Sequence, residues 1–98
     1  MKIRDNKVEG VEYIEAHAFD RRNEMRPEAI ILHDTAGQLT KFSSVNWFKS
    51  EECPTSAHFV IERDGTIVQM VPLNRRAYHA GASSLNGKPH CNNFTIGI

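Results

Sequence analysis

Five histidines stand out in this 98-residue chain, because imidazole is the side chain best suited to metal binding or proton transfer near neutral pH. They are His17, His33, His58, His79 and His90. The context of His33 is the most informative, since it ends an apolar run and precedes Asp-Thr-Ala-Gly. Ligands bind at strand ends in open α/β sheets, and an imidazole there can hold Zn²⁺ through one nitrogen while an acceptor fixes the other. A hydrogen-bonded buried histidine explains the same position equally well.

The other histidines have less specific surroundings. His79 lies in Tyr-His-Ala-Gly, where small residues let a ligand approach the backbone, so it either lines a cleft or sits in a solvated loop. His58 begins a β-rich run, and alternation could direct it to the core or to the cleft. His90 adjoins Cys91, which is weak evidence for a metal site, and His17 lies in a charged segment where exposure is expected.

The elements that must position these side chains are mainly strands. Residues 29–33 form a short apolar run that predicts a central, buried strand. Residues 57–62 and 66–71 flank an Arg-Asp-Gly turn and predict a β-hairpin. Residues 73–93 are loop-like, and residues 94–98 begin like a further buried strand.

One helix is expected after the first strand. Phe42, Val45 and Phe48 recur at spacing three, with Trp47 beside them and Ser43 or Ser44 available as a cap. This aromatic stripe could face a ligand, but helical spacing is what packing against a sheet requires, so the core interpretation is favoured. No internal repeat is visible.

Composition and charge exclude several classes of protein. The formal net charge is +0, which argues against a general nucleic-acid binder. After Asp64 there are three basic residues and no acidic one, so a partner there would be anionic or sugar-like, unless this is simply a solvated basic face. No apolar run approaches the ~18 residues of a transmembrane segment. No secretory signal is visible, so a cytoplasmic location at synthesis is expected.

The two cysteines, Cys53 and Cys91, fit no CxxC metal or redox motif. Two free thiols are the expected state, and a disulfide is the alternative in an oxidising compartment.

Four segments together resemble a known family. Residues 29–37, AIILHDTAG, are similar to the first zinc-histidine segment of the type 2 N-acetylmuramoyl-L-alanine amidases. This family includes phage lysozyme-like amidases, cell-wall recycling amidases and peptidoglycan recognition proteins. Residues 56–67, 71–81 and 92–98 resemble its central hairpin, its cleft loop and its next core strand, in the family's order.

The resemblance implies an α/β fold with a mixed β-sheet flanked by helices, apparently incomplete at the C-terminus. It divides the chain into an N-terminal arm, residues 1–28, and the N-terminal part of a single amidase domain, residues 29–98. It also implies a Zn²⁺-dependent hydrolase that cleaves the amide between N-acetylmuramic acid and L-alanine, with peptidoglycan or muropeptides as partners. The alternatives are a non-catalytic peptidoglycan-binding module and an inactive, truncated remnant.

By resemblance, His33 matches the first of three zinc ligands. The residues expected to contact substrate are Thr35, His58, His79 and Gly81. Ala57 stands where the phage lysozyme-like branch has a catalytic tyrosine, which favours the glutamate-using, recycling-type branch. The other zinc ligands and the glutamate are expected beyond Ile98. No catalytic residue is matched within the chain, so the 98 residues alone are not expected to be a competent hydrolase. They are also expected to be marginally stable, because the family's C-terminal part would cover one face of the sheet and its absence exposes apolar area.

Overall fold

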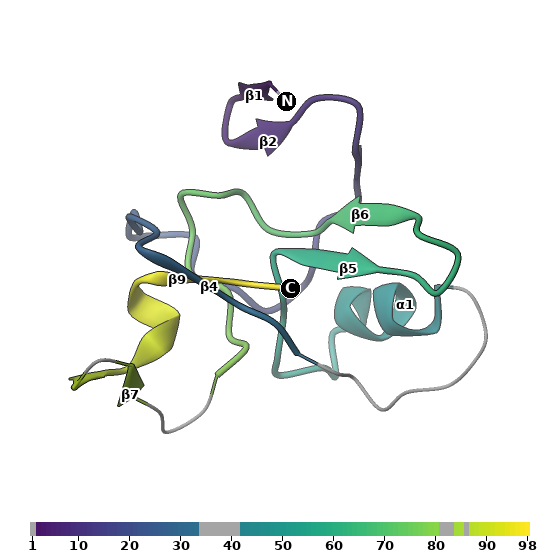
Figure 1. The fold of residues 1–98 in the computed structure, drawn as a ribbon. Coiled ribbons are helices and arrows are strands. Elements are labelled where there is room, and N and C mark those ends of the chain that lie inside the picture. Colours follow the sequence, from purple (N-terminus) through teal and green to yellow (C-terminus); the bar gives the residue numbers. More distant parts are fainter. Residues whose placement is uncertain (1, 34–41, 81–83, 86) are drawn as a thin grey trace.

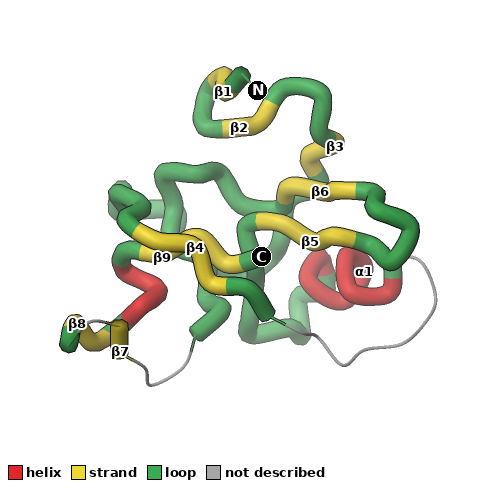
Figure 2. The backbone as a smooth tube through the Cα atoms, in the orientation of Figure 1, coloured by secondary structure: helices red, strands yellow, loops and turns green. Residues whose placement is uncertain are grey.

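The protein is seen in a computed structural model that describes residues 2–33, 42–80, 84–85 and 87–98. Across these residues the strands form four small sheets, with one α-helix packed beside the central hairpin (Figures 1 and 2). In chain order the elements are β1 (Ile3–Arg4), β2 (Lys7–Val8), β3 (Glu12–Tyr13), β4 (Ala29–Ile31), α1 (Ser43–Lys49), β5 (Phe59–Ile61), β6 (Ile67–Gln69), β7 (Ser84–Leu85), β8 (Lys88–Pro89), the 3₁₀ helix η1 (Cys91–Asn93) and β9 (Thr95–Gly97).

The predicted hairpin is confirmed. Strands β5 and β6 pair antiparallel with Ile61 opposite Ile67. Gly65 in the connecting turn has φ of 90°, a left-handed conformation that glycine adopts without strain. Strand β3 adds to the far side of β6 in parallel, which makes this three-stranded sheet mixed.

The strand predicted at residues 29–33 forms as β4, and it pairs in parallel with β9. Its predicted burial is wrong in this structure: Ile30 is 64% exposed and Leu32 is 76% exposed. In the described part of the chain β4 pairs with β9 alone, and the side chains of Ile30 and Leu32, which alternation places on the same face, remain exposed. Strand β9 itself is buried at all three residues.

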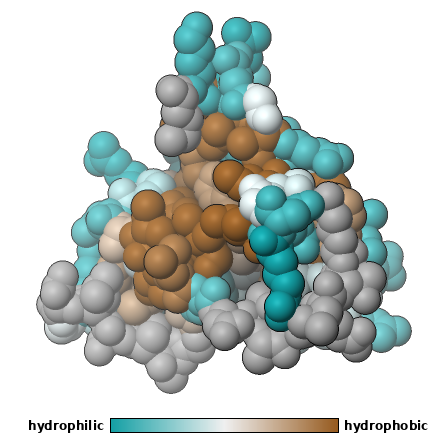
Figure 3. Space-filling view, turned by 45° about the vertical axis from the view of Figure 1, so that its right-hand side comes forward, coloured by the Kyte–Doolittle hydropathy of each residue, from teal (hydrophilic) through white to brown (hydrophobic). Residues whose placement is uncertain are grey.

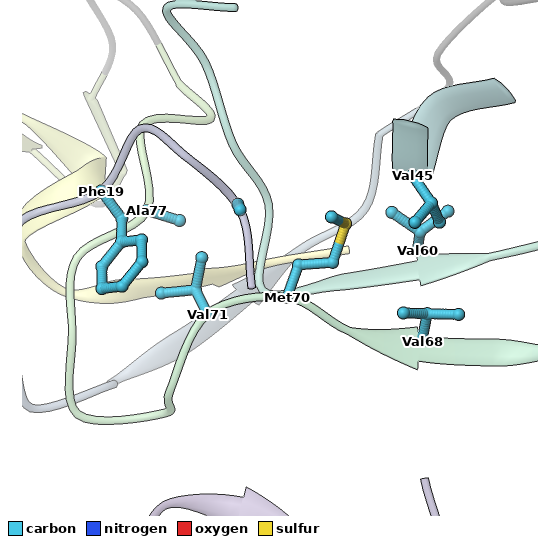
Figure 4. Close-up of a cluster of buried hydrophobic side chains, with 8 residues drawn as sticks. Phe19, Val45, Val60, Val68, Met70, Val71 and Ala77 are labelled. Carbon is cyan, nitrogen blue, oxygen red and sulfur yellow. The ribbon is translucent and has the colours of Figure 1, made fainter. Parts of the chain in front are cut away.

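The helix packs its apolar side onto the hairpin. Val45 joins Val60, Val68 and Met70 in the core cluster (Figure 4). The two phenylalanines of the predicted stripe pack against this cluster while partly buried. The core interpretation is therefore confirmed for Val45 and these two phenylalanines, and it is wrong for Trp47, which is 49% exposed and lies on the other side of the helix. The predicted serine cap is wrong, because the N-cap is Phe42, which has φ of 64° and provides no side-chain cap hydrogen bond.

The N-terminal segment contributes to the same core. The backbone N–H groups of Ile14 and Ala16 donate to the carbonyls of Gln69 and Met70, both at 2.9 Å. Ala16 and Phe19 are buried members of the core cluster. The division of the chain at residue 28 stays a prediction, but the segment before it already includes core side chains.

Residues 73–93 contain short elements that composition did not predict, namely the β7–β8 hairpin and η1.

Cys53 and Cys91 are both buried free thiols. None of the described helices is long and apolar enough to cross a membrane. Apolar side chains also gather on one face of the molecule (Figure 3). The large exposed apolar residues are Ile3, Ile30, Leu32, Trp47, Ile61 and Ile67.

Candidate functional site

A cleft of about 1290 Å³ opens beside β5, α1 and the end of β4. His33 and His79 both line it. Its described apolar lining includes Leu32, Trp47 and Ile98. The two histidines predicted to mark a ligand site therefore lie at one cleft, although 46 positions separate them in the sequence.

His33 and His79 are joined directly. His33 Nε2 lies 2.9 Å from His79 Nδ1, and the two rings meet edge to face with their centroids 5.1 Å apart. His33 follows β4, where its backbone N–H donates to the carbonyl of Ile98 at 2.8 Å. Its side chain is exposed, as an imidazole available to a ligand should be.

The second nitrogen of His79 points back into the protein. His79 Nε2 lies 3.0 Å from Thr95 Oγ1, and the Thr95 hydroxyl donates to the carbonyl of Cys91 at 2.6 Å. The ring also lies against the backbone of Gly97, two residues along β9. Burial lowers the pKa of His79, and the neighbouring His33 lowers it further, so both effects favour the neutral ring.

The segment that carries His79 is held on both sides. Ser56 N–H donates to the carbonyl of Tyr78, and the Ser56 hydroxyl accepts from Tyr78 N–H, both at 3.0 Å. Asn92 Oδ1 accepts from the N–H groups of His79 and Ala80, at 3.1 Å and 2.8 Å. These bonds fix the backbone, so the direction of the imidazole depends on the fold rather than on a free loop.

His58 connects the two central sheets. Its backbone N–H donates to the carbonyl of Gly97 at 2.9 Å, and Gly97 N–H donates to His58 Nδ1 at 3.1 Å. His58 Nε2 lies 2.7 Å from the carbonyl of Arg75, so this nitrogen carries the proton. The side chain is fully buried, and this burial lowers its pKa to about 4. With both nitrogens engaged, His58 acts as a structural tie here, and its expected contact with substrate stays a prediction that this burial does not favour.

The remaining predicted residues are dispersed or undescribed. Thr35 and Gly81, expected to contact substrate, lie outside the described residues. His17 and His90 are both exposed, and neither lines the cleft. Within the described ranges no group of three or more His, Cys, Asp or Glu side chains is arranged to hold a metal ion.

Sequence reasoning missed Thr95 and Gly97, which hold His79. A signal was available: residues two apart on a strand face the same side, so a Thr-x-Gly pattern on the last strand presents a hydroxyl and a bare backbone together. The pattern could not supply the partner, because the contact of Thr95 and Gly97 with the ring of His79 is a tertiary contact.

Comparison with known proteins adds a family assignment. A family model described as N-acetylmuramoyl-L-alanine amidase matches residues 23–98. The 1,6-anhydro-N-acetylmuramyl-L-alanine amidase AmpD of Citrobacter freundii is 60% identical over 43 residues, which are 44% of this chain and 23% of that protein. The N-acetylmuramoyl-L-alanine amidase XlyB of Bacillus subtilis is 30% identical over 79 residues, which are 81% of this chain and 23% of XlyB.

Two solved structures share the fold. A crystal structure of a selenomethionine AmpD derivative aligns with all of this chain and 64% of its own, with a TM-score of 0.83 and 28% identity. The solution structure of Citrobacter freundii AmpD aligns with all of this chain and 62% of its own, with a TM-score of 0.63 and 30% identity. This chain therefore spans less than two thirds of the AmpD structures, and the aligned sequence covers about a quarter of the curated relatives.

Proposed function

The chain belongs to the N-acetylmuramoyl-L-alanine amidase family, and from this we propose that the protein hydrolyses the amide bond between N-acetylmuramic acid and L-alanine in peptidoglycan or muropeptides. The family and the mixed-sheet fold confirm the corresponding predictions from sequence. The observation that carries the proposed activity is the placement of His33. The residue that the family motif marks as a metal ligand stands exposed at a cleft, with one ring nitrogen held by a neighbouring histidine.

Zinc is part of the proposal. His33 offers an imidazole donor of a kind that Zn²⁺ binds, and a hydrogen-bonded partner on the other ring nitrogen, here His79, is a support that metal-binding histidines usually have. When bound, the ion would polarise the scissile carbonyl as a Lewis acid. A catalytic zinc needs three protein ligands, and the described residues supply this one imidazole. The other donors and the general base are proposed to lie outside these residues.

The chain's own residues bind and orient. Both ring nitrogens of His79 are engaged, by His33 and by Thr95, which supports a cleft-lining role and argues against metal ligation by His79. Substrate would therefore meet the edge of this ring rather than a free nitrogen. The apolar wall formed by Leu32 and Trp47 can cover the less polar faces of a bound glycopeptide and exclude water from it.

The activity is tested by incubating the protein with a purified 1,6-anhydro muropeptide and Zn²⁺, and following release of the stem peptide by mass spectrometry. The assay uses the 98-residue chain and a fusion to the part of AmpD that extends beyond the aligned region. Cleavage by the fusion, lost in His33→Ala and kept in the exposed control His17→Ala, is the expected result. Absence of both cleavage and binding in the fusion overturns the proposal.

A peptidoglycan-binding module without catalysis is the second candidate. The observation behind it is the cleft itself, whose apolar wall and histidines can bind a ligand without a metal ion. Muropeptide binding by the fusion, without cleavage at saturating Zn²⁺, would select this function over the first.

A further inference from the structure

A chain of hydrogen bonds leads from the interior of the protein to His33. It begins at the carbonyl of Cys91, passes through the hydroxyl of Thr95 and the ring of His79, and ends at Nε2 of His33. Cys91 and Thr95 are buried and His79 is partly buried, so the two inner bonds are shielded from competition with water, whereas the His33–His79 bond lies at the exposed end of the chain of hydrogen bonds.

The direction of every proton in this chain follows from its buried end. A carbonyl can only accept, so the single proton of the Thr95 hydroxyl goes to Cys91. Thr95 Oγ1 must then accept from His79, which places the proton of the neutral His79 ring on Nε2. His79 Nδ1 consequently accepts, and the proton between the two histidines belongs to His33 Nε2.

We propose that Thr95 and His79 are positioning residues that fix His33 in the tautomer protonated on Nε2, so that Nδ1 is the nitrogen presented to a metal ion. The tautomer stands on this structure alone, whereas the metal rests on the proposed function. A free histidine exchanges between two tautomers and many ring orientations. Here the tautomer and the ring orientation of His33 are restricted before any metal binds. Hydrogen-bonded partners restrict metal-binding histidines in the same way in general.

Gly97 gives independent support, because it leaves room for the ring of His79 on β9. A Cβ on Gly97 would stand 2.7 Å from His79 Cδ2 and Nδ1, closer than real Cβ contacts allow. The strand therefore supplies both the hydroxyl that orients His79 and the bare backbone against which its ring lies.

The tautomer is measured directly in the ¹⁵N-histidine-labelled chain, by long-range ¹H–¹⁵N NMR that separates protonated from unprotonated ring nitrogens. We expect protonated Nε2 in both His33 and His79. In Thr95→Val, which keeps the shape but removes the hydroxyl, His33 should shift to a mixture of tautomers, and Thr95→Ser should restore the single form. Thr66→Val, in the β5–β6 turn, is the matched control and should change neither histidine.

A second variant keeps the test usable if Thr95→Val does not fold. His79→Phe retains a ring but removes the acceptor, and it should also release His33 into mixed tautomers. A proton on Nδ1 of His33 in the unaltered chain overturns the proposal, as does an unchanged tautomer ratio in a folded Thr95→Val or His79→Phe.

Zinc titration separates this inference from the proposed function. In the AmpD fusion, Thr95→Val should weaken Zn²⁺ affinity roughly 10- to 100-fold with unchanged stoichiometry, and Thr95→Ser should recover it. If the tautomers are as expected but the His33 resonances do not change when Zn²⁺ is added, the positioning role stands and the metal is removed from the proposed function. Equal Zn²⁺ affinity in folded Thr95→Val and unaltered fusion would contradict the effect of positioning on binding.

Discussion

The ring of His79 lies directly against the backbone of Gly97, and a side chain on Gly97 would overlap it. Gly97 is also paired at its backbone, since its N–H donates to His58 Nδ1 and its carbonyl accepts from His58 N–H. The strand cannot easily move away from the ring, because those bonds hold it to the neighbouring sheet. Gly97 thus leaves room for the ring of His79 and is bonded through its backbone to His58.

Replacement of Gly97 by alanine should therefore displace His79. The added methyl group must shift either the ring or the strand, and overpacking of this kind costs about 1–3 kcal/mol of the free energy of unfolding. We expect lower stability in urea denaturation, together with loss of the His33–His79 hydrogen bond in histidine NMR spectra. Gly65→Ala is the control: it strains a left-handed turn with nothing within 4 Å, so it should cost stability and leave the histidine signals unchanged.

If the proposed function holds, His33→Ala should abolish zinc binding by the intact protein. His33 is the exposed imidazole at the cleft, and its loss leaves the ion short of one of its proposed ligands. The measurement is metal content after dialysis against a weak chelator, with His17→Ala retaining zinc as the control. Stoichiometric zinc in His33→Ala would contradict the assignment. In His79→Ala the content at saturating zinc should remain while the affinity falls.

Local patterns predicted the hairpin, the helix and the last strand because each is encoded within a few residues. The Asp-Gly turn specifies the β5–β6 connection, and Phe42, Val45 and Phe48 specify the buried side of α1. The parallel pairing of β3 with β6 joins Tyr13 to Gln69, far apart in the sequence, and no local signal reveals such a pair. Burial of β4 was overestimated for a related reason, since an apolar run shows what could be buried but not whether an element covers it.

The candidate site likewise has a part that the sequence could predict and a part that it could not. His33 and His79 could be selected from their local segments, and the structure brings them to one cleft. The hydrogen bond between them, the hydroxyl of Thr95 behind them and the burial of His58 are products of tertiary packing. Residue type and spacing could identify the histidines but not their distinct roles.

The exposed face of β4 makes a prediction about stability. Leu32 is 76% exposed, so Leu32→Ser should change the free energy of unfolding by no more than about 0.5 kcal/mol. Val68 is fully buried, and Val68→Ser should cost roughly 1.5–3 kcal/mol or more. Urea denaturation compares the two, and sedimentation should show less self-association in Leu32→Ser because an apolar patch is reduced. A large loss of stability in Leu32→Ser would mean that this face is covered in solution.

Burial of His58 should make the fold sensitive to mild acid. The pKa of His58 is about 4 in the folded protein, against the ordinary value of 6.5 expected when unfolded. Between these values the unfolded chain binds more protons than the folded one, so stability falls as the pH drops from about 6.5 to about 4 and changes no further from this group below that. The shift corresponds to about 3 kcal/mol. Urea denaturation from pH 4 to pH 8 should show this slope in the unaltered chain and in His17→Gln, and a reduced slope in His58→Gln. An equal slope in a folded His58→Gln would show that another group causes the acid sensitivity.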